Sequence, residues 1–222
     1  MPKAKKKESK KVNIHNGVLY PVLNSAVNAM KYLCLVEGYK FIGKKFAGSD
    51  NSLEIKYSRI AVDIFIITKW LFLAVLWTLG VKDKWTTVVI WYLLATNLYT
   101  YFYYHSWAIE TLADTYFDPD RIKRRFNNLI MAFSYALFGF AYLYNLPYAQ
   151  DFSWSNGKPT FIQSLWFSIS TSLTAGYDQV KPSTNAGYSI SMIQLLMMFV
   201  FLTIIIGGSI PQVNQINKDG LK

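Results

Sequence analysis

Apolar residues along this chain gather into long runs that short polar segments separate. Three runs, at residues 60–81, 129–149 and 188–208, match the roughly 20 mostly apolar residues that a helix needs to cross a bilayer. A fourth run, at residues 85–107, contains no Asp, Glu, Lys or Arg but many tyrosines and tryptophans, which favour the bilayer interface. The pattern predicts an all-α, multi-pass membrane protein with four transmembrane helices.

The composition agrees with a membrane protein. Of the 222 residues, 52% are hydrophobic and 16% are charged. The net charge of +10 does not indicate a nucleic-acid partner, because lysines cluster at the extreme start of the chain. The two histidines, His15 and His105, and the single cysteine, Cys34, give no metal-ligand spacing, and the sequence has neither a nucleophile elbow nor a phosphate-binding glycine loop. The sequence therefore predicts neither an enzyme nor a cofactor.

Basic residues give the expected orientation, because short loops rich in Lys and Arg lie on the cytoplasmic side. This rule places inside a disordered basic tail at residues 1–16, a linker with Arg121, Lys123, Arg124 and Arg125, and a short tail at residues 209–222. The loop at residues 82–84 and residues 150–182 then lie outside, and both termini are cytoplasmic. The basic tail and the cluster from Arg121 to Arg125 either set this orientation alone or also bind anionic lipid headgroups.

Residues 17–58 precede the first long apolar run and are only moderately apolar. Lys31, Glu37 and Lys40 interrupt residues 18–46, which favours one or two amphipathic helices on the inner membrane surface. A fifth span over this stretch is the alternative. Residues 59–126 then hold two transmembrane helices and the basic cytoplasmic linker. In that linker, Asp118 and Asp120 around Pro119 indicate a helix start rather than a metal site.

Polar residues and glycines inside the predicted spans leave several alternatives open. Asp63 and Lys69 in the first span either pair, although six residues is a poor match to the helical repeat, or Lys69 extends toward the interface. Gln194 in the last span either faces a water-filled cavity or hydrogen-bonds a neighbouring helix. Gly207 and Gly208 favour the end of that helix over a bend.

A short segment before the last span has a different character. Residues 161–173, FIQSLWFSISTSL, contain no Pro or Gly and fit a helix of about three turns, which is too short to span a bilayer. Small and polar residues follow at positions 174–178. At membrane depth, such a helix and loop occur only where protein buries them or water borders them. The pattern predicts a re-entrant helix and a loop whose backbone carbonyls line a narrow path, with an ordinary outer turn as the alternative.

Residues 174–179 read Thr-Ala-Gly-Tyr-Asp-Gln. Trp166 and Phe167 precede them, Ser168 and Thr171 supply small hydroxyl side chains, and Pro182 follows. This arrangement resembles the pore-loop cation channels of the potassium channel superfamily. In that family an outer helix, a pore helix with an aromatic pair, a filter usually reading Thr-Val-Gly-Tyr-Gly-Asp, a proline and an inner helix follow one another. The resemblance runs from the third span onward.

The resemblance implies a pore domain at residues 127–208, made of outer helix, pore helix, filter and inner helix. It implies a selectivity filter at Thr174, Ala175, Gly176, Tyr177 and Asp178. Backbone carbonyls of the first four residues, with the Thr174 hydroxyl, would bind permeant K⁺ ions. Since one loop encloses no pore, the resemblance also implies a homotetramer.

Other residues of the motif have expected supporting roles. Gly176 would take a left-handed backbone conformation, which costs glycine little. Tyr177 would pack against Trp166 and Phe167 of its own or a neighbouring subunit. These two aromatic residues and Thr171 would thereby support the filter.

Three positions depart from the family pattern. Asp178 replaces the second filter glycine, Gln179 replaces the usual aspartate, and Leu173 stands where a second threonine is common. Four Asp178 side chains would form an acidic ring that concentrates cations at the outer mouth. The expected function is a homotetrameric channel for potassium or monovalent cations. A weakly selective cation channel and a non-conducting scaffold or accessory subunit are the alternatives.

Overall fold

The computed structural model describes residue 17 and residues 19–47, 51–107 and 119–209. The α-helices in these ranges are α1 (Leu19–Met30), α2 (Leu35–Ala47), α3 (Asn51–Thr78), α4 (Lys84–Phe102), α6 (Pro119–Asn145), α7 (Phe161–Ser172) and α8 (Asn185–Ser209). Shorter elements are 3-10 helices at Lys31–Leu33 and Ala149–Asp151, a π-helix at Tyr103–Trp107, and the strands β1 (Phe152–Trp154) and β2 (Val180–Pro182). The predicted tails at residues 1–16 and 209–222 lie outside the described residues, apart from Ser209.

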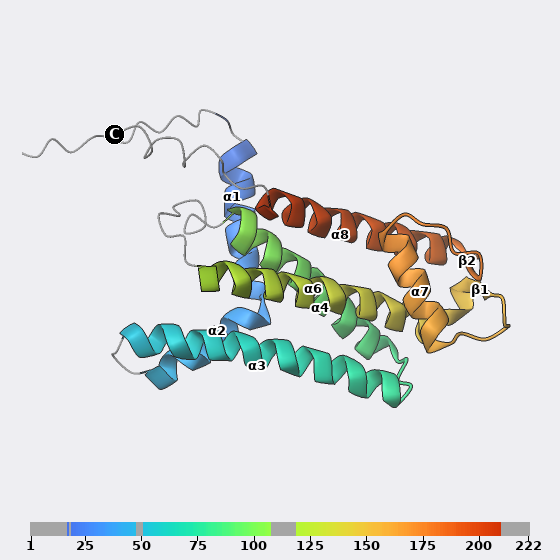
Figure 1. Ribbon diagram of the computed structural model, residues 1–222, viewed down its shortest axis with the longest axis horizontal. Helices are drawn as coiled ribbons and strands as arrows, with labels where there is room; N and C mark the ends of the chain where they lie inside the picture. The colour runs from blue at the N-terminus through green and yellow to red at the C-terminus, as the bar shows by residue number, and fades with distance from the viewer. Residues whose placement is uncertain (1–16, 18, 48–50, 108–118, 210–222) are drawn as a thin grey trace, which may run out of the picture.

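The four long helices form an antiparallel bundle (Figure 1). Helices α3 and α6 run in one direction, and α4 and α8 run in the other. At one end, the Tyr142 hydroxyl of α6 donates to the carbonyl of Val81, in the α3–α4 loop, at 2.5 Å. At the opposite end, Arg124 of α6 binds Asp63 of α3 at 2.9 Å. The α3–α4 loop therefore lies at the same end of the bundle as α7 and the strands.

Three of the described helices are long and apolar enough to cross a membrane. They cover Leu53–Thr78, Phe126–Asn145 and Asn185–Ile204, which confirms the three long apolar runs as helices. Helix α4 is not among them, because Thr, Asn and Tyr lower its hydropathy. Its 19 residues still reach about 28 Å, and its Ile90 and Leu94 are completely buried. Polar residues are tolerated in such a helix where its neighbours cover them.

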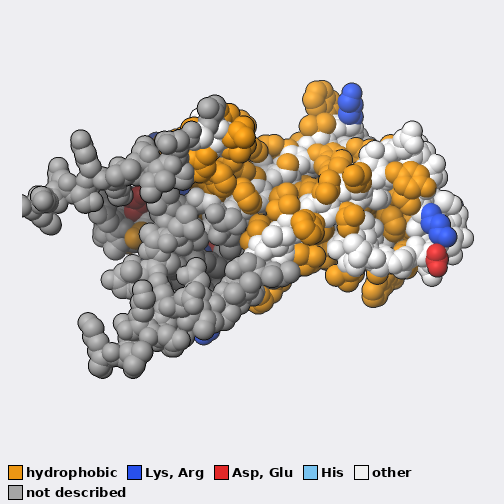
Figure 2. Space-filling view, turned by 90° about the horizontal axis from the view of Figure 1, so that it is seen from above, with side chains coloured by type: hydrophobic (Ala, Val, Ile, Leu, Met, Phe, Trp, Pro, Cys, Tyr) orange, Lys and Arg blue, Asp and Glu red, His pale blue; other side chains and the backbone are white. Residues whose placement is uncertain are grey.

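The surface of α3 separates into an outer and an inner side. Exposed apolar residues three or four positions apart form the outer side: Ile60, Ile64, Ile67, Leu71 and Val75. Leu73 and Leu76 lie on the inner side and are buried. Figure 2 shows hydrophobic side chains over the middle of one face of the molecule, with charged side chains near its edges. An apolar surface of this extent fits contact with lipid or with further subunits.

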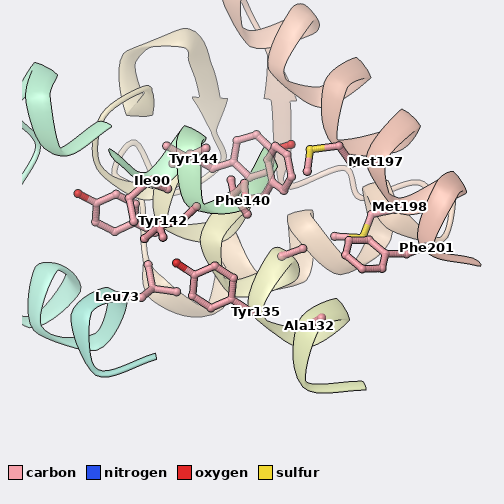
Figure 3. Close-up of a cluster of buried hydrophobic side chains, with 14 of the residues drawn as sticks. Leu73, Ile90, Ala132, Tyr135, Phe140, Tyr142, Tyr144, Met197, Met198 and Phe201 are labelled. Atoms are coloured by element: carbon pink, nitrogen blue, oxygen red, sulfur yellow. The ribbon is translucent and has the colours of Figure 1, made fainter. Parts of the chain in front are cut away.

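Helix α6 lies at the centre of the core (Figure 3). Its Tyr135, Phe140 and Tyr142 are completely buried, and residues from the neighbouring helices surround them. These neighbours include Leu73 of α3, Ile90 of α4, and Met198 and Phe201 of α8. Gly139 permits the close approach of α4, since a Cβ at this position would lie 2.8 Å from Leu94 Cδ2. Helices α7 and α8 therefore pack against the same central helix that contacts α3 and α4.

Two helices extend beyond their predicted bounds. Helix α6 begins at Pro119, as the Asp-Pro signal indicates, so the basic linker and the span form one helix. It ends at Asn145 because Leu146 precedes Pro147, and a residue before proline disfavours the helical conformation. Helix α3 begins at Asn51, well before the apolar run at residue 60.

The segment before α3 forms two helices that break at Cys34. With 12 and 13 residues, α1 and α2 are each too short to span a bilayer, so the alternative of a fifth span is wrong. Helix α2 packs along α3, where Lys44 binds Glu54 at 2.8 Å. Helix α1 packs against the end of α4, and the Tyr99 hydroxyl donates to the carbonyl of Val27 at 2.6 Å.

Candidate functional site

The predicted short helix before the last span is confirmed as α7. Thr160 caps its start, and the Thr160 hydroxyl accepts a hydrogen bond from the backbone N–H of Gln163 at 3.3 Å. The 12 residues give a length of about 18 Å. Helix α7 lies near one end of the bundle, beside α6 and α8 (Figure 1). Most of its buried side chains are polar, and Ser164 and Ser168 are completely buried.

A pair of short strands closes the segment that contains α7. Strands β1 and β2 pair antiparallel, with Phe152 opposite Pro182 and Trp154 opposite Val180. The chain therefore leaves the end of the bundle and returns to it at one place, with α7 and the following loop between the strands. The sequence did not predict this pairing, because strands of three residues carry no recognisable alternation.

The loop at residues 173–177 follows α7 directly. The backbone N–H of Ala175 donates to the carbonyl of Ser170 at 2.8 Å, which folds the loop back against the helix end. Among the described residues, no hydrogen bond reaches the carbonyl oxygens of Thr174, Ala175 and Gly176. Residues 173–176 are also exposed on the single chain. Unpaired carbonyls of this kind suit the coordination of a dehydrated cation.

The carbonyl of Tyr177 differs from the three before it. It accepts a hydrogen bond from the backbone N–H of Val180 at 3.4 Å. A carbonyl oxygen has two lone pairs, so one bond of this length does not exclude a second ligand. Within the described residues, no group of three His, Cys, Asp or Glu side chains is placed to hold a metal ion.

The backbone conformation of the loop differs from the prediction. Thr174 has a φ of 55°, in the left-handed region, whereas Gly176 and Asp178 do not adopt positive φ. The expectation that Gly176 takes this conformation is therefore wrong. The left-handed region costs a β-branched residue about 1–2 kcal/mol. The Thr174 hydroxyl donates to the carbonyl of Leu173 at 2.7 Å, a local bond that offsets part of this cost.

The predicted supporting residues take three different positions. Phe167 is buried, and its ring lies 4.9 Å from the Tyr144 ring of α6. Trp166 points outward and is 56% exposed. Thr171 contributes its carbonyl, which accepts from the backbone N–H of Thr174 at 3.2 Å. Phe167 thus packs α7 against α6, Thr171 bonds the first part of the loop, and Trp166 presents an indole to the surroundings.

The end of the loop farthest from α7 is polar. The Asp178 side chain is 98% exposed and lies 3.3 Å from the Lys181 ammonium. The Tyr177 hydroxyl donates to Gln179 Oε1 at 3.0 Å rather than packing on Trp166 or Phe167 of its own chain. Because both side chains are exposed, this ion pair contributes little to stability.

Comparison with known proteins identifies the segment that carries this loop. Residues 130–210 match the model of an ion channel family. The ion channel domain covers most of α6 together with α7, the loop and α8. The match confirms the resemblance to a two-helix, pore-loop cation channel. With three apolar helices of spanning length, it identifies an integral membrane protein. No curated protein and no solved structure matched the chain.

The charged residues of α3 bind partners on other helices. Both oxygens of Asp63 accept from Arg124 Nη2 at 2.9 Å, at the start of the helix that enters the ion channel domain. Lys69 is buried and donates to Asn97 Oδ1 at 2.5 Å. Both predicted alternatives for Lys69 are therefore wrong, because it neither pairs with Asp63 nor reaches the interface. The side chains of Arg121 and Arg125 lie outside the described residues.

A second polar cluster joins α2 to the π-helix that continues α4. The Lys40 ammonium binds Glu37 Oε1 at 2.8 Å and the Tyr104 hydroxyl at 2.7 Å. The Tyr104 hydroxyl also donates to Glu37. Burial raises the pKa of Glu37, but the hydrogen bonds from Lys40 and Tyr104 outweigh it and leave this pKa below its ordinary value. Glu37 therefore stays ionised and fixes α2 against the end of the bundle opposite the ion channel loop.

Proposed function

We propose that this chain is the subunit of a homotetrameric channel that conducts potassium or other monovalent cations. Ions would pass through a filter at Thr174, Ala175, Gly176, Tyr177 and Asp178. The unpaired carbonyls of Thr174, Ala175 and Gly176 are the observation that carries this proposal. They replace water around a dehydrated cation once several copies of the loop surround one axis.

Exposed groups on α7 and α8 support a ring of subunits. Trp166 and Leu173 beside the loop, and Met192 and Phe199 on α8, are each more than half exposed on the single chain. One loop cannot enclose a path, and closed rotational symmetry provides the missing walls. Four copies would bury these apolar side chains against their neighbours and bring four loops together. The acidic mouth then consists of four Asp178 carboxylates, which raise the local cation concentration.

The proposed subunit has four spans, with α4 as the fourth. In this arrangement α7 and the loop enter the membrane from the outer side and return without crossing it. The basic residues at the N-terminus and in residues 121–125 then lie inside, together with both termini. Residues 17–58 lie on the inner membrane surface, and the basic tail contacts anionic headgroups.

Selectivity separates the main proposal from its alternatives. Asp178 and Gln179 stand where the related channels have glycine and aspartate, so a weakly selective cation channel is the second candidate. A non-conducting accessory subunit is the third. The reversal potential of the purified protein in a planar bilayer, with potassium on one side and sodium on the other, distinguishes them. We expect a value close to the potassium limit; a value near zero with clear current supports the second candidate.

A Gly176→Ala variant tests whether the loop conducts. A Cβ at Gly176 meets no atom within 4 Å in the same chain, and the backbone there does not require glycine. The variant should therefore fold and assemble like the wild type. Any loss of current must then arise where the loops of different copies meet around the ion path. We expect at least a tenfold loss of current, because a methyl group in each copy disturbs the ring of carbonyls.

Gly38→Ala is the matched control. Gly38 lies in α2, at the other end of the molecule, and a Cβ there also meets nothing within 4 Å. This variant should leave the current unchanged. If Gly176→Ala tetramers conduct as well as Gly38→Ala tetramers, the loop is not the ion path. Well-formed wild-type tetramers without current would support the accessory subunit instead.

A further inference from the structure

Gln194 of α8 forms a completely buried hydrogen-bond cluster behind the ion channel loop. Its Nε2 lies 2.7 Å from the carbonyl of Ser168, 2.9 Å from the Ser168 hydroxyl and 2.7 Å from the Ser172 hydroxyl. Its Oε1 accepts from the Tyr144 hydroxyl at 2.5 Å. Gln194, Ser168 and Tyr144 are each 0% exposed. Of the two alternatives that the sequence left open for Gln194, the structure shows hydrogen bonds to neighbouring helices.

The cluster connects three helices through a single side chain. Ser168 and Ser172 belong to α7, Tyr144 to α6 and Gln194 to α8. The Ser168 hydroxyl also donates to the carbonyl of Leu137 in α6 at 2.8 Å. The amide of Gln194 therefore uses both its donor and its acceptor groups, and the cluster needs no water to satisfy it. An apolar side chain of the same size would fill the space but could not hold α7 in one register.

The cluster holds the last turn of α7, directly before the loop. Ser172 is the last residue of α7, and Thr174 is the residue with the left-handed backbone. The N–H of Ala175 bonds the carbonyl of Ser170, inside the turn that Gln194 fixes. A shift of this helical turn would move the loop with it, because no flexible segment separates the two.

We propose that Gln194 is a positioning residue that locks the final turn of α7 to α8 and to α6, and thereby sets the position of the loop carbonyls. This inference rests on the proposed channel function. It identifies a physical connection between α8 and the carbonyls that we propose to bind ions. Tyr144 orients the Gln194 amide, so that its nitrogen faces the two serines.

Two substitutions test the connection. Gln194→Met keeps the volume but removes every hydrogen bond, and Ser172→Ala removes a single oxygen from the cluster. Ser170→Ala is the matched control, because its buried hydroxyl bonds only carbonyls of its own helix, Trp166 at 2.9 Å and Phe167 at 3.1 Å. If Gln194→Met does not assemble, Ser172→Ala still removes one bond to Gln194 with minimal change of volume.

Single-channel recording in planar bilayers is the first measurement. We expect Gln194→Met to shorten the mean open time or to lower the potassium-to-sodium permeability ratio by at least about tenfold, because the loss of a single buried hydrogen bond already corresponds to a change of about tenfold. Ser172→Ala should act in the same direction, and Ser170→Ala should match the wild type. The double variant should equal Gln194→Met alone, since Ser172 acts through Gln194. Unchanged gating and selectivity in Gln194→Met tetramers would overturn the proposal.

Hydrogen exchange of the amides in residues 168–180 tests the role of Gln194 without relying on ion conduction. If wild-type tetramers pass no current, the proposed function fails, and exchange then decides the role of Gln194. Faster exchange in Gln194→Met but not in Ser170→Ala means that Gln194 holds α7. Equal exchange in both variants means that it does not.

Discussion

Lys69, the buried lysine of α3, stabilises the bundle either through the hydrogen bond of its ammonium or through packing of its aliphatic chain. The sign of a change in Tm distinguishes these two explanations. Lys69 is 5% exposed, its ammonium donates to Asn97 Oδ1 at 2.5 Å, and it lies 4.6 Å from the centre of the Tyr135 ring. Asn97 Nδ2 in turn donates to the carbonyl of Ala132 at 2.9 Å. Asn97→Leu therefore leaves the ammonium without its hydrogen-bond acceptor inside the bundle.

The expected destabilisation by Asn97→Leu follows from the buried position of Lys69 between the helices. Leaving a buried charge unpaired costs about 3–5 kcal/mol in soluble proteins, whereas interhelical hydrogen bonds in membranes contribute about 0.6–1.7 kcal/mol. The Tyr135 ring remains in Asn97→Leu and offsets part of the loss. We therefore expect a destabilisation of about 2 kcal/mol, and a Tm lower by about 4–8 °C for a chain of this length. Lys69→Met removes the charge itself and should cost less than half as much.

The double variant is the decisive measurement. Thermal unfolding of the detergent-solubilised protein gives Tm for the wild type, both single variants and the pair. If the cost of Asn97→Leu arises from an unpaired ammonium, adding Lys69→Met should raise Tm again. Thr96→Val is the control, because the Thr96 hydroxyl bonds a carbonyl of its own helix at 2.8 Å.

A double variant with a lower Tm than Asn97→Leu alone would refute this reasoning. Lys69 would then contribute through packing of its aliphatic chain, and the hydrogen bond to Asn97 would be incidental. Equal losses from Asn97→Leu and Thr96→Val would also refute it, because the control removes no contact between helices.

Two further predictions concern the helices around this site. Asp83 caps α4, and the hydrogen bonds from Thr86 hold the Asp83 pKa below its ordinary value. Its contribution is therefore complete above the ordinary pKa and disappears as the pH falls through the lowered one, so Asp83→Ala should reduce the acid sensitivity of Tm in circular dichroism melts at pH 2–5. Gly139→Ala places a Cβ 2.8 Å from Leu94 Cδ2 and should lower the free energy of unfolding by about 1–3 kcal/mol. In a chain that already carries Leu94→Ala, Gly139→Ala should lower it by less, because the clashing side chain is gone.

The long helices and α7 could be predicted from the sequence because local patterns determine them. An uninterrupted apolar run of about 20 residues has few alternatives to a spanning helix. Residues 161–173 read as a short helix because no Pro or Gly interrupts them. Helix α4 is harder to predict, because polar residues lower its hydropathy and only the folded bundle shows that Asn97 is buried.

The pairing of polar residues inside the bundle could not be predicted. Asp63 and Lys69 lie close together in the sequence, so they were natural candidates for each other. Their partners, Arg124 and Asn97, are far away along the chain and become neighbours only through the antiparallel order of α3, α4 and α6. The basic residues at positions 121–125 predicted the orientation of the chain, but they did not predict that Arg124 would bind Asp63 of α3.

Within the candidate site, residue types were easier to predict than backbone conformation. The motif located the loop, and its unpaired carbonyls lie at Thr174, Ala175 and Gly176. The left-handed residue is Thr174 and not Gly176, because the turn that closes α7 bends at the first loop position. Glycine is the residue that normally occupies a left-handed position, because other residues lose about 1–2 kcal/mol there. Only contacts with the rest of the fold can impose this conformation on Thr174.

Hydrogen bonds at three levels of the bundle explain how its helices hold the loop at residues 174–176 in place. In a bilayer, helices gain no hydrophobic free energy by leaving lipid for one another, so apolar packing alone leaves their register weakly determined. Arg124 fixes α6 to α3 near one end, Asn97 fixes α4 to Lys69 and to α6 in the middle, and Gln194 fixes α8 to α6 and α7 beside the loop. Each bond is directional, so a shift of one helix by a single turn breaks it. The position of the carbonyls in residues 174–176 therefore depends on polar contacts across the whole bundle. Variants at Asn97 should alter the ion current less than variants at Gln194, because Gln194 bonds Ser172, close to these carbonyls.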